Sequence, residues 1–290
     1  MELIHARGST YYFECQSRVG LYAFGQRAAV FDTGNGKPAA KRVLSALEEL
    51  GLSLAAILNT HSHADHIGGN AHLQAVTGAP VYAPPVECGF VNHPQLEGAL
   101  IYSAAPPKPL RGRFFLSDPS RALPLTDAVL PEGVSVIPLY GHAADQVGYR
   151  TPDDVVFLGD ALVSRETLDK YRISYIYDVG AYLDTLRRVK ELHAALFVPA
   201  HAEATEDILP LADYNIAATM EIGDDILGLL ATPHTAEGVL KALFDRYGLT
   251  LGFGQFALAG STVRAYLAWL YDSGLVTAEP CDNYLLFRRV

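Results

Sequence analysis

Short apolar segments of strand length alternate with amphipathic helical segments over the first two thirds of the chain. Residues 11–24 and 27–32 predict strands, and apolar residues three and four positions apart predict a helix over 37–50. Further buried-strand patterns occupy the following ranges: 54–58, 80–83, 134–139, 155–158 and 195–198. This alternation predicts a domain of mixed α and β structure and leaves its layering open.

From about residue 204 the pattern becomes helical, with three apolar stripes at helical spacing. The stripes are Ile222, Ile226, Leu229 and Leu230, then Leu240, Leu243, Phe244 and Tyr247, then Val263, Tyr266, Leu267 and Leu270. Two strand patterns, 275–279 and 283–289, predict a terminal hairpin. We therefore divide the chain into a domain over 1–210 and a mostly helical domain over 211–290. Helices followed by a hairpin resemble a winged helix.

Two segments interrupt the alternation and are candidates for substrate contact. Residues 84–127 contain several prolines without sustained periodicity, which favours a lid, a substrate loop or an ordinary surface excursion. His93 lies within this segment and is one candidate substrate contact. The segment 164–177 carries three more candidates, whose cations and phenol suit an anionic substrate group: Lys170, Arg172 and Tyr175. Solvated or interface positions are the alternative for these side chains.

Composition and charge narrow the class of protein. The 290 residues are 50% hydrophobic and 19% charged, as in an ordinary globular chain. No segment has the roughly 18 apolar residues of a membrane span, and no signal peptide is recognisable, so we expect a cytoplasmic protein without a membrane partner. The net charge is −10, and residues 211–290 hold nine acidic and five basic side chains, which argues against a nucleic-acid partner. The helical domain is then expected to pack or to form a homodimer.

Cysteine usage indicates neither a disulfide framework nor a cysteine metal site. The chain has three cysteines at wide spacing, Cys15, Cys88 and Cys281. Their number is odd, and none is paired at the short spacing of a metal-binding motif. We expect them to behave as small apolar side chains.

The highest density of potential metal ligands lies in the segment 60–66, Thr-His-Ser-His-Ala-Asp-His, which comes just after the strand pattern 54–58. Three imidazoles and one carboxylate so close together are poor packing residues, because each buried polar group needs its own partner. A metal ion is the natural partner. At the mouth of a strand His61 and His63 can converge on one divalent ion, while Asp65 and His66 turn toward a second.

Three other strand patterns also end at residue types that bind metals. The residues concerned are His142, Asp160 and His201. Ligands at strand ends are held by rigid elements and remain reachable from solvent. The repetition therefore predicts one composite metal site assembled from distant parts of the chain.

This ordered set resembles the metallo-β-lactamase superfamily of dinuclear metallohydrolases over roughly residues 1–210. Asp32, followed by Thr-Gly, resembles the first motif of that family, an aspartate that supports the site without entering it. The resemblance implies an α+β fold, the four-layer αββα sandwich. It also implies two zinc ions, with iron or manganese as alternatives, held by seven ligands. His61, His63 and His142 would hold one ion, Asp65, His66 and His201 the other, and Asp160 would bridge the two.

The resemblance further implies the chemistry. A water between the two ions loses a proton near neutral pH, and the bridging hydroxide is the expected nucleophile. Asp65 and Asp160 are the predicted catalytic residues, and Asp65 would also orient the nucleophile or protonate the leaving group. β-Lactamases of this fold usually have cysteine or serine in place of Asp160, so we expect a different small-molecule substrate, a thioester or a lactone. Glyoxalase II usually has a histidine in place of Ser62, so hydroxyacylglutathione is not specifically indicated.

Three alternatives remain open at this point. A phosphodiesterase or endoribonuclease of the same fold is favoured by relatives with winged tails and opposed by the acidic charge. An iron persulfide dioxygenase would use one iron held by His61, His142 and Asp160. A non-enzymatic winged-helix interaction module would use the metals only as a brace, which does not require seven ligands around an open site.

Overall fold

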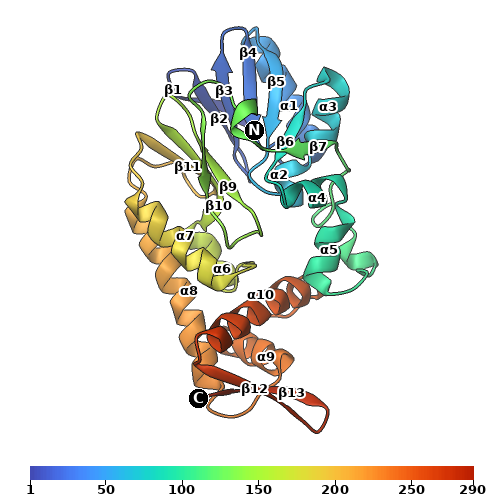
Figure 1. Cartoon of the computed structure of the whole chain (residues 1–290), viewed down its shortest axis with the longest axis vertical. Coiled ribbons are helices and arrows are strands. Elements are labelled where there is room, and N and C mark those ends of the chain that lie inside the picture. Colours follow the sequence, from blue (N-terminus) through green and yellow to red (C-terminus); the bar gives the residue numbers. More distant parts are fainter.

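The computed structural model describes residues 1–290 and contains two β-sheets that face each other (Figure 1). The first sheet has seven strands in chain order, antiparallel from β1 to β4 and parallel from β4 to β7. They are β1 (Glu2–Arg7), β2 (Thr10–Glu14), β3 (Val19–Phe24), β4 (Arg27–Phe31), β5 (Ser53–Leu58), β6 (Val81–Ala83) and β7 (Ala122–Pro124). The sequence patterns located β2 to β6, whereas β1 was missed because its side chains are largely exposed.

The second sheet has four strands in the order β11, β10, β9, β8, with only β10 and β11 parallel. They are β8 (Ser135–Pro138), β9 (Val147–Arg150), β10 (Val155–Val163) and β11 (Leu196–His201). Aromatic side chains fill the space between the two sheets. Phe31 of the first sheet lies 4.9 Å from both Tyr149 and Phe157 of the second, ring centroid to ring centroid.

Helices cover the outer face of each sheet and complete four layers. α1 (Gly36–Glu49) and α3 (Asn70–Thr77) pack on the first sheet, sharing a core with β3, β4 and β5. α7 (Val179–Glu191) and α8 (Leu209–Leu229) pack on the second sheet. Both α1 and α7 bury an apolar stripe, which is the physical reason why each lies flat on a sheet. The expected αββα sandwich is confirmed.

The segment 84–127 is more ordered than its prolines suggest. It contains α4 (Glu87–Asn92), α5 (Gln95–Tyr102), the 3₁₀ turn η1 (Lys108–Leu110) and strand β7, followed by the turn η2 (Asp127–Val129). Val91 of α4 is fully buried against the edge of the first sheet. The expectation of a segment without packed helices is therefore wrong for 87–102, because these helices are too short to show a clear apolar period. Contact of this segment with substrate stays a prediction. Residues 112–116 form turns and no strand.

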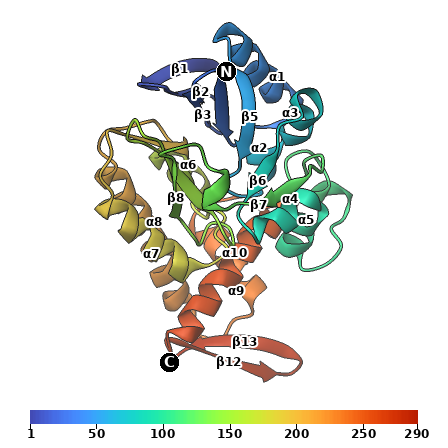
Figure 2. The same ribbon diagram turned by 45° about the horizontal axis from the view of Figure 1, so that its top comes forward.

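The C-terminal part consists of α8, α9 (Ala236–Arg246), α10 (Phe253–Asp272) and a hairpin of β12 (Val276–Cys281) and β13 (Tyr284–Arg289). The hairpin lies at the opposite end of the molecule from β1 and α1 (Figure 2). All three helical stripes are confirmed, and α10 begins well before the stripe that revealed it. The predicted division at 210/211 falls inside α8, and one apolar core runs from α7 through α8 to α9 and α10. The likeness to a winged helix stays a prediction.

The three cysteines, Cys15, Cys88 and Cys281, are all free. No helix combines the length and the apolar character that a bilayer crossing requires.

Candidate metal centre

The histidine-rich segment lies at the carboxyl end of β5, where the chain leaves the first sheet. His63 is the N-terminal flanking residue of the short helix α2 (Ala64–Ile67), which carries Asp65 and His66. The extended residues 61–63 and the helical turn thus send neighbouring side chains in two directions. The other candidates come from the second sheet and its loops, so the site lies where the two sheets meet.

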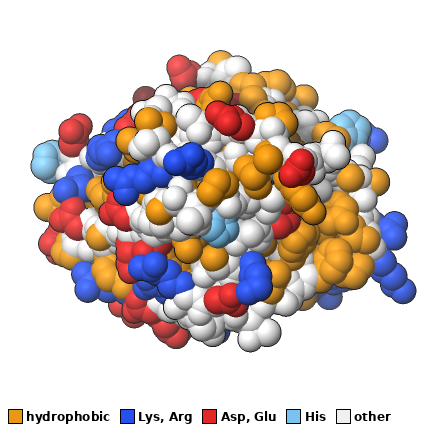
Figure 3. All heavy atoms as spheres, turned by 90° about the horizontal axis from the view of Figure 1, so that it is seen from below, with side chains coloured by type: hydrophobic (Ala, Val, Ile, Leu, Met, Phe, Trp, Pro, Cys, Tyr) orange, Lys and Arg blue, Asp and Glu red, His pale blue; other side chains and the backbone are white.

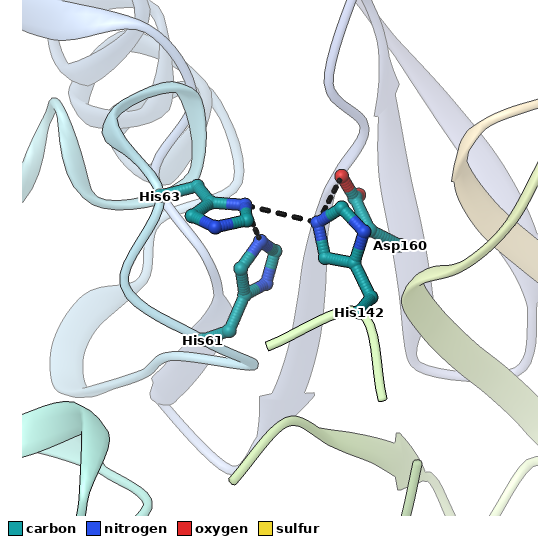
Figure 4. Close-up of side chains that lie close together, drawn as sticks. All are labelled: His61, His63, His142 and Asp160. Atoms are coloured by element: carbon teal, nitrogen blue, oxygen red, sulfur yellow. Dashed lines mark hydrogen bonds and ion pairs between the residues drawn. The ribbon is translucent and has the colours of Figure 1, made fainter. Parts of the chain in front are cut away.

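Four of the candidates form one compact group. One ligand atom from each of His61, His63, His142 and Asp160 lies within 4.8 Å of the others. His63 Nδ1 is 3.0 Å from His61 Nε2 and 2.9 Å from His142 Nε2. Figure 4 shows His61 and His63 reaching in from one side and His142 and Asp160 from the other.

A glycine fixes the approach of His142. Gly141 has φ 116°, and a Cβ there would lie 2.2 Å from the backbone nitrogen of Tyr182 in α7. Only glycine tolerates both this dihedral angle and this contact. The pairing of glycine with histidine in the sequence therefore reflects close packing of the loop on α7.

The imidazole tautomers of the first group leave lone pairs facing one another. His142 Nδ1 lies 3.2 Å from the carbonyl oxygen of Tyr175, which can only accept, so this nitrogen carries the proton and Nε2 does not. His63 Nε2 faces a carboxylate oxygen of Glu97 at 3.2 Å, which leaves Nδ1 as the bare nitrogen. Bare nitrogens about 3 Å apart repel unless a cation or a proton lies between them. This donor arrangement fits a divalent metal ion.

Asp65, His66 and His201 form the second group, again within 4.8 Å of one another. His201 Nε2 lies 3.2 Å from Asp65 Oδ2 and 3.3 Å from Asp160 Oδ2. His66 Nε2 and Asp160 Oδ1 are buried and face each other at 3.0 Å, and neither has another hydrogen-bond partner. A metal ion held between a buried nitrogen and a buried oxygen of this kind would satisfy both. Asp160 therefore contacts both groups, since its Oδ2 is also 3.3 Å from His142 Nε2.

The sequence placed Asp160 at the end of a strand. In the structure it lies inside β10, which continues to Val163. The strand is irregular here: its register against β11 shifts on either side of Gly159. Gly159 has φ 51° and packs against Thr60. The bulge turns the aspartate toward the other sheet.

Asp32 supports the site from behind, as the family resemblance implies. Its Oδ1 accepts from the backbone nitrogen of Thr60, and its Oδ2 accepts from the hydroxyl of Thr60, each at 2.7 Å. His66 Nδ1 donates to the same Oδ2 at 2.8 Å. Because Nδ1 is then protonated, His66 Nε2 is free to face the second group.

Three supporting side chains escaped the sequence analysis. Glu97 of α5 faces His63, and Ser17 donates to Asp65 Oδ2 at 2.5 Å. Glu87 of α4 accepts from the hydroxyl of Ser62 at 2.5 Å and from its backbone nitrogen at 3.1 Å, which anchors the histidine-rich segment. Both glutamates lie in the segment 84–127. Glu87 and Glu97 could be recognised only by being acidic and buried, and their burial depends on the tertiary fold.

The metal-free site holds protons at neutral pH. Burial disfavours the charged form of His201, but the carboxylates of Asp160 and Asp65 outweigh it and raise the His201 pKa to about 10. Burial also lowers the pKa of His66, but the carboxylates of Asp160, Asp65 and Asp32 outweigh burial and raise this pKa well above its usual value. Burial and neighbouring histidines lower the pKa of His61, and burial chiefly lowers the pKa of His142 to about 3. The carboxyls of Asp65 and Asp160 have depressed pKa values because nearby imidazolium charges overcome the effect of burial.

We expect metal binding to release protons and to tighten as the pH rises. His66 and His201 are protonated below their raised pKa values and must lose those protons to bind a metal. Lowering the pH from about 8 to about 6 should weaken binding, and protons should leave the protein as the metal binds near pH 7. Titration calorimetry of zinc into the metal-free chain, in two buffers of different ionisation enthalpy, counts these protons. A pH-independent affinity without proton release would contradict the assigned protonation states.

A large cavity, with a volume of about 1460 Å³, opens beside both groups. Lys170 and Tyr175 line it, together with His63, Asp65, His142 and His201. Arg172 and His93 do not line it, and their contact with substrate stays a prediction. The guanidinium of Arg172 is held by Glu221 at 2.8 Å, and His93 is exposed at the end of α4. The sequence placed both residues in the correct segments but could not show where their side chains point.

Known proteins share this architecture. A metallo-beta-lactamase family protein from Thermus thermophilus superposes with a TM-score of 0.73 at 22% identity, over 97% of this chain and 99% of that one. A beta-lactamase domain protein from Burkholderia ambifaria gives 0.72 at 16% identity, over 100% and 94%. At these identities the likeness is one of fold, and it includes the C-terminal part.

Relatives in sequence carry enzyme names. A hydroxyacylglutathione hydrolase from Albidiferax ferrireducens is 50% identical over 62 residues, which is 21% of this chain and 23% of the relative. An atrochrysone carboxyl ACP thioesterase from Emericella nidulans is 26% identical over 190 residues, 63% of this chain and 50% of the relative. The chain thus spans half or less of the length of these relatives. The profile of the Metallo-beta-lactamase superfamily matches residues 12–201. The chain belongs to the metallo-beta-lactamase superfamily.

Proposed function

We propose that the protein is a dinuclear metal-dependent hydrolase of a small-molecule thioester, with zinc in both positions. The observation that carries the proposal is the position of Asp160, whose two carboxylate oxygens contact His66, His142 and His201. A carboxylate shared between two groups of imidazoles suits two adjacent divalent cations. Both relatives named above bear names of thioester-cleaving enzymes, which supports a thioester before a lactone.

Two divalent ions held there would supply a nucleophile from water near neutral pH and polarise the carbonyl oxygen of the substrate. The protein's own groups then do the positioning. Asp65 is partly exposed to the cavity, and its depressed pKa keeps it an ionised carboxylate that can help to hold an ion and orient the nucleophile. Ser17 fixes the orientation of that carboxylate. A thiolate leaving group needs little help from an acid, so hydrolysis of a thioester does not depend on a further proton donor in the site.

The test combines metal content with turnover. Elemental mass spectrometry of the purified protein is expected to find about two zinc ions per chain, and the protein should hydrolyse a simple acyl thioester. Asp65→Asn should lower turnover by at least about 10²-fold, because asparagine lacks the negative charge that helps to hold the second ion and to orient the nucleophile. One iron per chain would favour oxidation instead, and inactivity on every thioester with two zincs bound would refute the thioester assignment.

We expect no salt-sensitive binding of duplex DNA or RNA near physiological ionic strength. Figure 3, which looks onto the C-terminal end of the molecule, shows basic and acidic side chains interspersed among hydrophobic ones. Nucleic-acid affinity depends on a cationic surface that displaces counterions, and residues 211–290 are net acidic. A gel-shift assay at submicromolar protein is the measurement. A shift that weakens steeply with added salt would instead favour the nuclease alternative.

A further inference from the structure

The cavity beside the metal centre is larger than the reaction at an ester bond requires. Its volume of about 1460 Å³ exceeds the roughly 300–1000 Å³ typical of sites for small molecules. α10 lines part of it with Gly254, Gln255, Leu258 and Ala259. Figure 1 shows this helix running from the region near the C-terminus to α5. The C-terminal helices are therefore part of the substrate site and do not serve only for packing.

One side of this cavity is apolar. Four of its lining residues also belong to a single apolar cluster, which we name the apolar wall: Ile101, Phe115, Tyr175 and Leu258. They come from α5, the turns after η1, the segment before α7, and α10. Phe115 rests against the backbone of α10, since a Cβ on Gly254 would lie 3.4 Å from its ring. Four separate segments of the chain thus converge to build this surface.

The apolar wall begins at the metal centre. The ring of Tyr175 lies 5.3 Å from that of His63 and 5.8 Å from that of His142. Tyr175, Phe115 and Leu258 all pack against the same buried cluster of Ile101, Leu110 and Ala257. The nearest carboxylate on α5, that of Glu97, is turned to His63 Nε2 and does not face the wall.

The opposite side of the cavity is polar. α6 (Arg165–Tyr171) lines it with Arg165, Glu166 and Lys170, and the segment after β11 adds Glu203 and Asp207. These side chains carry charges of both signs and are exposed to solvent. A substrate with an apolar part and a polar part would therefore have one preferred orientation in the cavity.

We propose that the apolar wall binds the acyl chain of the substrate and makes the enzyme selective for thioesters of longer, apolar acyl groups. This inference rests on the proposed thioester hydrolase function. A chain extending from the reacting carbonyl passes Tyr175 and lies along Phe115 and Leu258, while the thiol carrier leaves toward α6. Each methylene removed from water contributes about 0.8 kcal/mol, so kcat/KM should rise by up to about 4-fold per methylene while the chain contacts the wall.

The test compares acetyl, butyryl, hexanoyl and octanoyl thioesters of one small thiol, with the full chain loaded with zinc. In the wild type kcat/KM for octanoyl is expected to exceed that for acetyl by at least about 50-fold. Phe115→Ala and Leu258→Gln should each reduce this ratio by at least about 5-fold. Phe253→Ala is the matched control, since Phe253 is an exposed aromatic residue of α10 that stacks on Tyr102 outside the cavity. Thermal melting and metal content establish that each variant is folded.

The outcomes separate this inference from the proposed function. A wild type that hydrolyses all four thioesters equally well overturns the acyl-binding wall and leaves thioester hydrolysis standing. A ratio that falls as much in Phe253→Ala as in Leu258→Gln also overturns it. If no thioester is hydrolysed, the proposed function fails, and calorimetric binding of decanoate and acetate decides. Tighter binding of decanoate that is lost in Leu258→Gln supports the wall, and equal binding of the two overturns it.

Discussion

Asp160→Asn is expected to lower turnover by at least about 10²-fold and to weaken the binding of the second metal ion. The carboxylate lies between the two groups of ligands, with Oδ1 at 3.0 Å from His66 and Oδ2 at 3.3 Å from both His142 and His201. Asparagine has nearly the same shape, but it is neutral and presents an NH₂ group to one of these nitrogens. Two cations would then lose the negative charge that they share.

The measurements are metal content by elemental mass spectrometry and turnover of whichever thioester the wild type accepts. Asp127→Asn is the matched control, because Asp127 is an exposed aspartate in η2, outside the cavity, and its substitution should change little. Near-normal turnover of Asp160→Asn with full metal content would contradict the dinuclear mechanism.

The position of Asp160 also shows what the sequence could and could not reveal. The histidines at 61, 63 and 66 were recognisable because a local turn brings them together, and His201 because β11 ends on it. The bulge that directs Asp160 inward depends on packing between Gly159 and Thr60, which no local pattern reports. The same holds for Glu97, whose role follows from the docking of α5 beside His63.

The cavity illustrates the larger limit of sequence patterns. Helical spacing revealed α10, but it could not show that Leu258 lines the cavity, because that depends on how α10 crosses α5. The charge of Arg172 suggested a substrate contact, and the sequence could not show that its partner in the structure is Glu221, 49 residues away. Local periodicity predicts elements, whereas side-chain partners distant in sequence decide their roles.

Asp32→Asn is expected to remove the second metal ion while leaving the first site loaded. Asp32 has φ 61°, a backbone conformation that asparagine tolerates well, so the substitution should not strain the turn. The difference is in hydrogen bonding. Oδ2 of the aspartate accepts from the Thr60 hydroxyl and from His66 Nδ1, and an asparagine NH₂ at that place would face two donors.

His66 can relieve this conflict by moving its proton from Nδ1 to Nε2, which is the nitrogen that faces Asp160 and the second group. A protonated Nε2 cannot bind a metal, so we expect about one zinc per chain in place of two, and at least about a 10-fold loss of affinity for the second ion. The free energy of unfolding of the metal-free chain should also fall by about 1–3 kcal/mol, because a buried charge-assisted hydrogen bond is lost. Asp153→Asn is the control: Asp153 accepts from Ser9 and Thr10 away from the site, so its loss should lower stability without changing metal content. Two zincs bound with wild-type affinity in Asp32→Asn would show that the His66 tautomer does not depend on Asp32.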